Sequence, residues 1–171
     1  MEKPTYVSGI LIVNKEIGLP KNYNPGISKK MMVAYCIMKM CALKTKVKLN
    51  IVSGFRSYKY QEKIYNEYVK EYGIEKTNTF SAKPGHSEHQ TGLAIDICDD
   101  SDKFIGSKED KWLQKNAYKF GFIVRYPKGK EHITGYKYEP WHIRYVGKKH
   151  AKRIYDKKLT LEEYLGLWQE N

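Results

Sequence analysis

The segment SEHQTGLAID, residues 87–96, carries the clearest structural pattern of this 171-residue chain. Its second half predicts a strand over residues 91–98, in which Leu93, Ile95 and Ile97 point to one side of a sheet and Ala94 and Asp96 to the other. A charge on the face of a sheet is costly unless it is paired or binds a metal ion. Asp96 therefore marks this strand as a candidate functional element.

Further elements are expected on both sides of this strand. They are a helix from the Ser28 cap to about Leu43, a strand over 48–53, a helix over 58–72, a helix over 108–120 capped by Ser107, a strand over 122–125, a strand over 141–146, and a last helix from Thr160 to about Trp168. Thr160 and Glu163 form a capping-box pattern. In the helix over 58–72 we expect Ile64, Tyr65 and Tyr68 to form the buried side. Residues 73–90 are expected to form a long polar loop.

Short strands mixed with three or four helices predict the α+β class, with a small, mostly antiparallel sheet flanked by helices. The length suits one domain, and no linker or repeat divides the chain. We expect a single domain over 1–171, with an N-terminal segment over 1–25 rich in Pro, Gly and Asn near its end and a core over 26–171.

The net charge of +12 predicts an anionic partner, such as an anionic cell wall or a carboxylate-rich substrate. The basic residues are scattered and accompany no nucleic-acid motif, so specific nucleic-acid binding is not expected. Three cysteines without a CxxC pair argue against a disulfide framework. The first residues lack a signal-peptide pattern, so we expect a cytoplasmic location, or the cell envelope if an export segment has been removed. A monomer is expected.

A possible metal site combines Asp96 with His89, seven residues before it, and with His142 in the strand over 141–146. Imidazole and carboxylate groups suit Zn²⁺, and a catalytic zinc ion usually takes three protein ligands and leaves one position for water. One zinc ion is therefore expected. From these residues alone an alternative stays open, in which Asp96 pairs with an arginine and His142 is a half-buried imidazole with satisfied hydrogen bonds.

Three segments in order, SGFRS at 53–57, SEHQTGLAID at 87–96 and EPWHIRYVG at 139–147, resemble the VanY-type D-alanyl-D-alanine carboxypeptidases. This metallopeptidase family includes LD-carboxypeptidases and VanX-type dipeptidases. Its zinc motif has the form SxHxxGxAxD, and every fixed position is matched here, by Ser87, His89, Gly92, Ala94 and Asp96. The resemblance runs from about Leu11 to the end of the strand over 141–146.

The resemblance implies a role for each matching residue. His89, Asp96 and His142 correspond to the zinc ligands, which places the zinc site on the sheet face. Glu139 corresponds to the catalytic base. Arg56 and Ser87 correspond to groups that bind the substrate's terminal carboxylate or the developing oxyanion, so Arg56 is expected to act in both binding and catalysis.

Two residues near this set carry weaker expectations. Gln61 corresponds to a polar residue of the family near Arg56 and is expected to contribute to substrate binding. Arg144 shares a strand face with His142, so support of that ligand from behind is plausible.

The function implied is a zinc-dependent D,D-carboxypeptidase that removes the terminal D-Ala from peptidoglycan stem peptides. The alternatives are an LD-carboxypeptidase acting on tetrapeptides and a D-Ala-D-Ala dipeptidase. A more distant alternative is a non-catalytic, zinc-bearing binding module, as in hedgehog-type domains, which resemble this fold. Glu139 argues against that module, because a protein that only binds has no need of a base.

Overall fold

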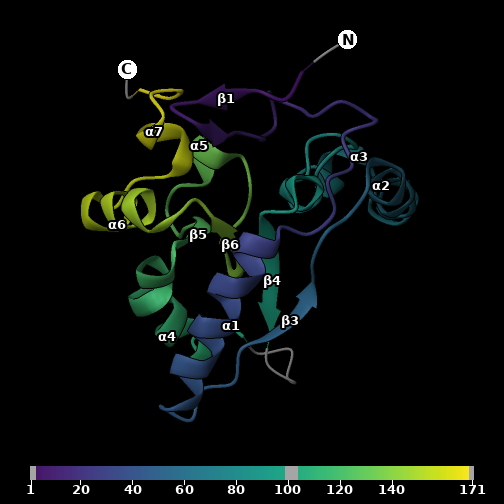
Figure 1. Ribbon diagram of the computed structural model, residues 1–171. Coiled ribbons are helices and arrows are strands. Elements are labelled where there is room, and N and C mark those ends of the chain that lie inside the picture. The colour runs from purple at the N-terminus through teal and green to yellow at the C-terminus, as the bar shows by residue number, and fades with distance from the viewer. Residues whose placement is uncertain (1–2, 99–103, 170–171) are drawn as a thin grey trace.

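A computed structural model of the protein describes residues 3–98 and 104–169, and its centre is a four-stranded antiparallel sheet with strand order β3-β4-β6-β5 (Figure 1). The strands are β3 (Asn50–Ser53), β4 (Ala94–Cys98), β5 (Phe122–Tyr126) and β6 (Glu139–Tyr145). A separate two-stranded hairpin joins β1 (Tyr6–Val7) to β2 (Ile10–Leu11). The expected α+β class and small antiparallel sheet are confirmed.

The helices begin where the sequence provides capping side chains. Ser28, Ser107 and Thr160 each accept a backbone N–H in the first turn of a helix, and Thr160 forms the full capping box with Glu163. The α-helices are α1 (Lys29–Leu43), α2 (Tyr58–Tyr72), α3 (Ile74–Thr77), α4 (Lys108–Asn116), α5 (Glu131–Thr134), α6 (Lys148–Lys157) and α7 (Leu161–Tyr164). Two 3₁₀ helices are η1 (Glu88–Thr91) and η2 (Ala117–Phe120).

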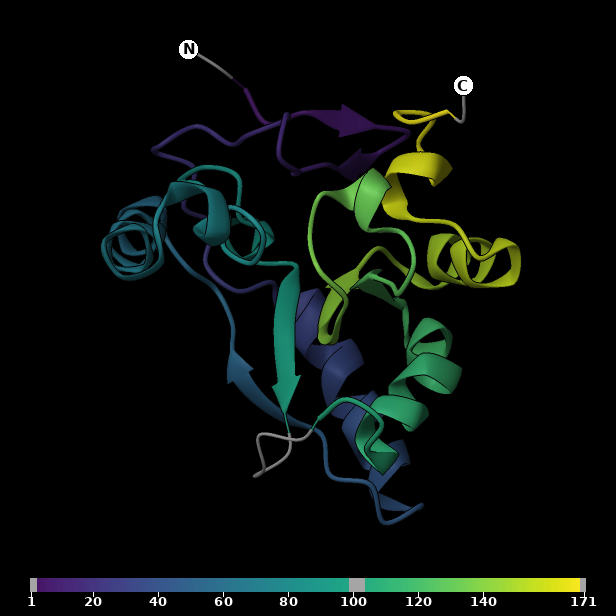
Figure 2. The same cartoon turned by 180° about the vertical axis from the view of Figure 1, so that it is seen from behind.

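The main core lies between α1 and one face of the sheet (Figures 1 and 2). Met31 and Met38 of α1 are fully buried there, together with Ile95 of β4 and Ile143 of β6. Burying each of these side chains stabilises the fold by about 1.5–3 kcal/mol. This face of the sheet therefore supplies much of the stability that fixes the strands.

The opposite face carries two of the candidate functional residues, Asp96 and His142, in one row with Ser53. Ser53 of β3 pairs with Asp96 of β4, and Asp96 pairs with His142 of β6. Directly paired residues on neighbouring antiparallel strands have side chains on the same face, within about 4.5–5.5 Å of one another at Cβ. The strand register alone therefore brings Asp96 and His142 together, although 46 positions separate them.

A second core joins the two ends of the described chain. Ile10 and Ile12 pack with Ile123 of β5, Ile154 of α6 and Leu161 of α7. The β1–β2 hairpin and α7 accordingly lie at the same end of the molecule (Figure 1).

The structure corrects the expectation for α2. Its one buried residue among those described is Gln61; Ile64 and Tyr65 are half-buried, and Tyr68 is 37% exposed. Ile64 and Tyr68 line an open pocket rather than packing into a core. A hydrophobic helix face indicates an inner side, but it does not distinguish a core from a pocket wall.

Other elements also differ from those expected. The loop predicted over 73–90 contains α3 and ends in η1, α7 ends earlier than expected, and α6 was not foreseen. Within the described residues, none of the helices is long and apolar enough to cross a membrane.

Candidate active site

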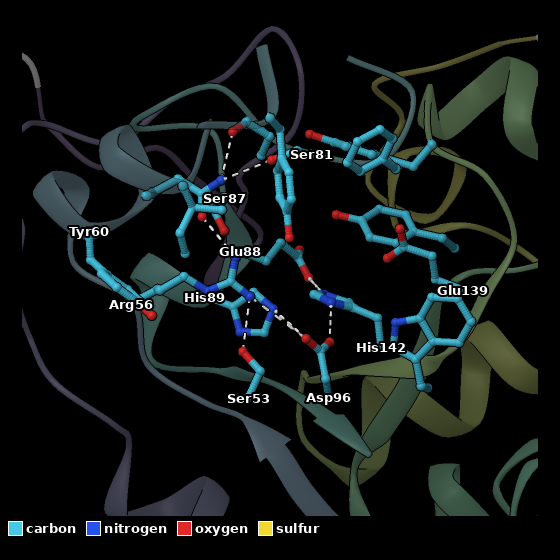
Figure 3. A pocket seen from close by; sticks show the side chains of 18 residues that line it. Ser53, Arg56, Tyr60, Ser81, Ser87, Glu88, His89, Asp96, Glu139 and His142 are labelled. Carbon is cyan, nitrogen blue, oxygen red and sulfur yellow. Dashed lines mark hydrogen bonds and ion pairs between the residues drawn. The ribbon is translucent and has the colours of Figure 1, made fainter. Parts of the chain in front are cut away.

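All the site residues expected from the sequence line a single pocket of about 370 Å³ (Figure 3). They are Arg56, Gln61, Ser87, His89, Asp96, Glu139 and His142. In the close-up view Arg56 and Ser53 lie on one side of the His89–Asp96–His142 group and Glu139 on the other. Residues from distant parts of the sequence thus converge on one cavity.

The potential metal ligands lie close together. Asp96 Oδ2 lies 3.2 Å from His89 Nε2, and Asp96 Oδ1 lies 2.9 Å from His142 Nδ1. One ligand atom from each of the three residues can be chosen so that all lie within 4.8 Å of one another. Two imidazoles and a carboxylate are the donor set of a catalytic zinc site, so the residues present fit the ion.

In each histidine, the ring nitrogen that does not face Asp96 has a hydrogen-bond partner of its own. His89 Nδ1 lies 2.7 Å from the Gly54 carbonyl oxygen, and His142 Nε2 lies 3.3 Å from Glu88 Oε2. Metal-binding histidines usually donate their second ring N–H to a carbonyl or carboxylate, which fixes the ring orientation. Both rings are therefore held so that His89 Nε2 and His142 Nδ1 face Asp96.

The structure shows why the SxHxxGxAxD motif has a glycine at position 92. Gly92 ends η1 in the left-handed conformation, at φ +70°, just before β4 begins. A Cβ at this position would lie 2.0 Å from the Gly26 carbonyl oxygen, and the Gly92 carbonyl accepts the Ser28 N–H. Only glycine fits both constraints, and the close turn sets His89 and Asp96 on either side of it.

Arg56 is held at the edge of the His89–Asp96–His142 group. Its guanidinium donates to Ser53 Oγ and to Gln61 Oε1, both at 2.9 Å, and lies 3.7 Å from Asp96 Oδ2. The pairing of Asp96 with an arginine, an alternative left open by the sequence, thus occurs alongside its contacts with both histidines. A guanidinium has five N–H donors, and these contacts leave donors for a ligand.

Gln61 lies behind Arg56 at the pocket wall. It is 1% exposed, and its amide nitrogen donates to the Ala82 carbonyl at 2.7 Å while its oxygen accepts from Arg56. These contacts suit a group that orients Arg56. Direct substrate contact by Gln61, and by the buried Ser87, stays a prediction.

The pKa values of the site reflect burial among charges. Burial opposes ionisation of the Asp96 carboxyl, but His89 and His142 hold its pKa well below the usual range. Burial likewise disfavours the charged form of His142, but hydrogen bonds to Asp96 and Glu88 raise the pKa of its ring to about 9. A proton and a metal ion would therefore compete for His142 Nδ1.

Glu139 sits in a different environment from Asp96. Burial raises the pKa of the Glu139 carboxyl to about 7, although His142 and Arg56 act in the opposite direction. A bound cation nearby would lower this pKa again. A carboxyl group whose pKa lies near neutral pH can both accept and return a proton.

A cluster of buried charges behind His142 was missed by the sequence reasoning, apart from Arg144. Glu88 Oε1 accepts from Arg125 Nε at 2.8 Å and from Arg144 Nη1 at 2.6 Å, and all three side chains are 0% exposed. Arg125 also bonds Glu162 of α7. Arg125 could have been noticed, because it interrupts an apolar strand as Asp96 does.

Comparisons with known proteins agree with this geometry. The VanY family profile, described as D-alanyl-D-alanine carboxypeptidase, matches residues 24–148. The putative carboxypeptidase YodJ of Bacillus subtilis (strain 168) is 47% identical over 180 residues, which cover 91% of this chain and 66% of YodJ. The curated relatives are longer, and the matches cover between 37% and 66% of their lengths.

Two solved structures are similar over nearly the whole chain. The LdcB LD-carboxypeptidase is 40% identical with a TM-score of 0.86, over 99% of this chain and 95% of LdcB. A mutant of the vancomycin-resistance D,D-pentapeptidase VanY, in complex with Zn(II), is 37% identical with a TM-score of 0.82, over 91% of this chain and 97% of that one. The match to the family profile extends over well more than half of the sequence and includes every residue of the proposed metal site, so the chain belongs to the VanY family of D-alanyl-D-alanine carboxypeptidases.

Proposed function

We propose that this protein is a zinc-dependent carboxypeptidase that releases the terminal D-Ala from peptidoglycan stem peptides, with the D,D-bond of the pentapeptide as its substrate. One observation carries the proposal: the His89–Asp96–His142 group, Glu139 and Arg56 face the same pocket. A zinc ion held by these three residues would polarise the scissile carbonyl and make a water molecule more acidic.

Glu139 is proposed as the general base. Its carboxylate would take a proton from the attacking water and pass it to the amine of the departing D-Ala. The position of Glu139 at the start of β6, three residues before His142, keeps the base at the rim of the metal group. General acid–base catalysis of this kind contributes about 10²–10⁴-fold to the rate.

Arg56 is proposed to bind the free carboxylate of the substrate. An arginine presents a planar fork that matches a carboxylate and cannot lose its charge. Ser53 and Gln61 hold the guanidinium at the pocket edge, so its position relative to Asp96 is set before substrate arrives. A fixed carboxylate site would align the last peptide bond with the metal and exclude internal bonds.

A second candidate is the L,D-bond of the tetrapeptide, and the similarity to the LdcB LD-carboxypeptidase over 99% of this chain favours it. The two reactions would use the same metal and base. They differ in the residue that precedes the cleaved bond, which the pocket wall of Tyr60, Ile64 and Tyr68 would contact from α2.

The test is a panel of stem peptides ending in D-Ala-D-Ala or in a single D-Ala, each with a free or an amidated C-terminus, analysed by mass spectrometry. We expect loss of one D-Ala from the free pentapeptide, little loss from amidated peptides, and no loss with a zinc chelator. Preference for the tetrapeptide would establish the second candidate. Equal cleavage of free and amidated peptides would contradict the role of Arg56.

The variant Glu139→Gln should keep zinc and lose about 10²–10⁴-fold in kcat. Glu131→Gln, at an exposed position on α5, serves as the control and should retain wild-type turnover. Near-normal turnover in Glu139→Gln would remove Glu139 from the base role.

A further inference from the structure

We propose that Glu88 is a positioning residue for the metal site: it holds the Nε2–H of His142 and thereby presents Nδ1 to the metal ion. The inference rests on the proposed metal site and assigns a role to a residue between the fixed positions Ser87 and His89 of the motif. Glu88 lies behind His142 as seen from Asp96, and Figure 3 shows the line of contacts from Glu88 through His142 to Asp96.

The contacts define which nitrogen donates. An ionised carboxylate can only accept hydrogen bonds, so the ring nitrogen facing it must carry the proton. Glu88 Oε2 is 3.3 Å from His142 Nε2, while Nδ1 faces Asp96, which also contacts His89. The proton that a metal ion would displace is therefore the one on Nδ1, and Nε2 keeps its proton.

Two arginines keep Glu88 ionised and immobile. Arg125 and Arg144 both donate to Glu88 Oε1, and neither arginine can lose its charge at accessible pH. Each arginine is itself anchored elsewhere: Arg144 donates to the Leu11 carbonyl at 2.5 Å, and Arg125 bonds Glu162 Oε2 at 2.8 Å. Glu88 therefore cannot turn away from His142 without breaking several buried contacts.

The two histidines differ in how they are oriented. A backbone carbonyl, that of Gly54, holds His89, whereas a side chain holds His142. Side-chain partners of this kind typically change metal affinity by about 10–100-fold when they are replaced. Substituting Glu88 therefore measures how much the orientation of His142 contributes to metal affinity.

A purely structural role for Glu88 would be to neutralise the buried arginines. Glu162 provides a matched control, because it is 4% exposed and bonds the same Arg125, and the contacts described for it do not include His142. Two carboxylates, Glu88 and Glu162, balance the two arginines. Either Glu→Gln substitution therefore leaves the same excess of one positive charge.

The experiment compares Glu88→Gln with Glu162→Gln in the full chain. Thermal unfolding of the metal-free proteins measures the structural loss, and competition with a chromophoric chelator measures zinc affinity. We expect both variants to lose stability, and Glu88→Gln alone to bind zinc about 10–100-fold more weakly than wild type. Equal zinc affinity in Glu88→Gln and wild type would overturn the inference, as would an equal loss in both variants.

A measurement on the wild-type protein covers the case in which Glu88→Gln does not fold. ¹⁵N NMR of the zinc-loaded protein, with histidine labelled, reports which ring nitrogen carries a proton. We expect His142 to be protonated at Nε2; protonation at Nδ1 would refute the assignment. If wild-type protein fails to bind zinc at all, the proposed function fails as well, which separates that outcome from a failure of the Glu88 inference alone.

Discussion

The two faces of the four-stranded sheet are built from alternate residues of the same strands, yet they differ in chemistry around Asp96 and His142. Toward α1 the strands present Ile95 and Ile143, both fully buried among apolar side chains. Toward the pocket, their sequence neighbours Asp96, His142 and Arg144 form hydrogen bonds and ion pairs with charged side chains. The apolar face stabilises the strands, and their fixed positions hold Asp96 and His142 in place on the pocket face.

Charged side chains buried on the pocket face need partners of opposite charge. Removing one member of a buried ion pair typically costs about 3–5 kcal/mol, because the remaining charge is left without compensation. On this face Glu88 has two arginines as partners, and Asp96 has two histidines and Arg56. We therefore expect substitutions on the two faces to have separable effects.

The largest effect is expected for Asp96→Asn on the charged face. An amide is a poor zinc ligand, so zinc binding should be lost and kcat/KM should fall by roughly 10⁴-fold or more, since the metal's contribution of several kcal/mol disappears. Metal analysis and peptide hydrolysis test this, with Asp156→Asn on the exposed side of α6 as the control. Retention of zinc by Asp96→Asn would exclude Asp96 as a ligand.

A smaller effect, of another kind, is expected for Met38→Ala on the apolar face. Met38 of α1 is 0% exposed to solvent and lies in the main core, so truncation should cost about 2–5 kcal/mol of unfolding free energy. Denaturant unfolding measures this loss. Zinc stoichiometry and kcat at a temperature where the variant is folded should match wild type; a large change in either would show that the faces are not separable.

The smallest effect is expected for Ile143→Val, directly next to His142 in β6. Loss of one buried methyl group should cost about 0.5–1.5 kcal/mol, or a few degrees in Tm for a domain of this size. Zinc affinity should remain within twofold of wild type, because Ile143 points away from the pocket. A tenfold weaker zinc affinity would mean that the packing of Ile143 in the core affects the position of His142.

The sequence predicts the elements that depend on local patterns. The Ser28, Ser107 and Thr160 caps each act within a few residues and are found as expected. The alternation around Asp96 holds for Ile95 and Ile97, which lie in the main core, but β4 begins at Ala94 and Leu93 packs with Leu11, Val13 and Leu19 instead. The convergence of the motif residues on one pocket was implied by resemblance, not by local pattern, because it depends on pairing between strands distant in sequence.

What escaped prediction depends on contacts between distant segments. Helix α6 is rich in lysine, and only Ala151 and Ile154 are buried in it, so its apolar stripe is too narrow to stand out. The pairing of Glu88 with Arg125 and Arg144 joins residues 37 and 56 positions apart. The position of Arg144 on the face of His142 could be predicted from strand alternation, but its link to His142 through Glu88 could not, because a single charge in a motif does not reveal its partners.

The anchoring of Arg125 and Arg144 has a consequence for the order in which the protein matures. Arg144 reaches back 133 positions to Leu11, and Arg125 requires Glu162, which is synthesised after every proposed metal ligand. A growing chain that already contains His89, Asp96 and His142 still lacks the carboxylate that balances Arg125. The charged network behind His142 therefore cannot be complete before α7 has been synthesised, although all three proposed metal ligands precede α7 in the sequence.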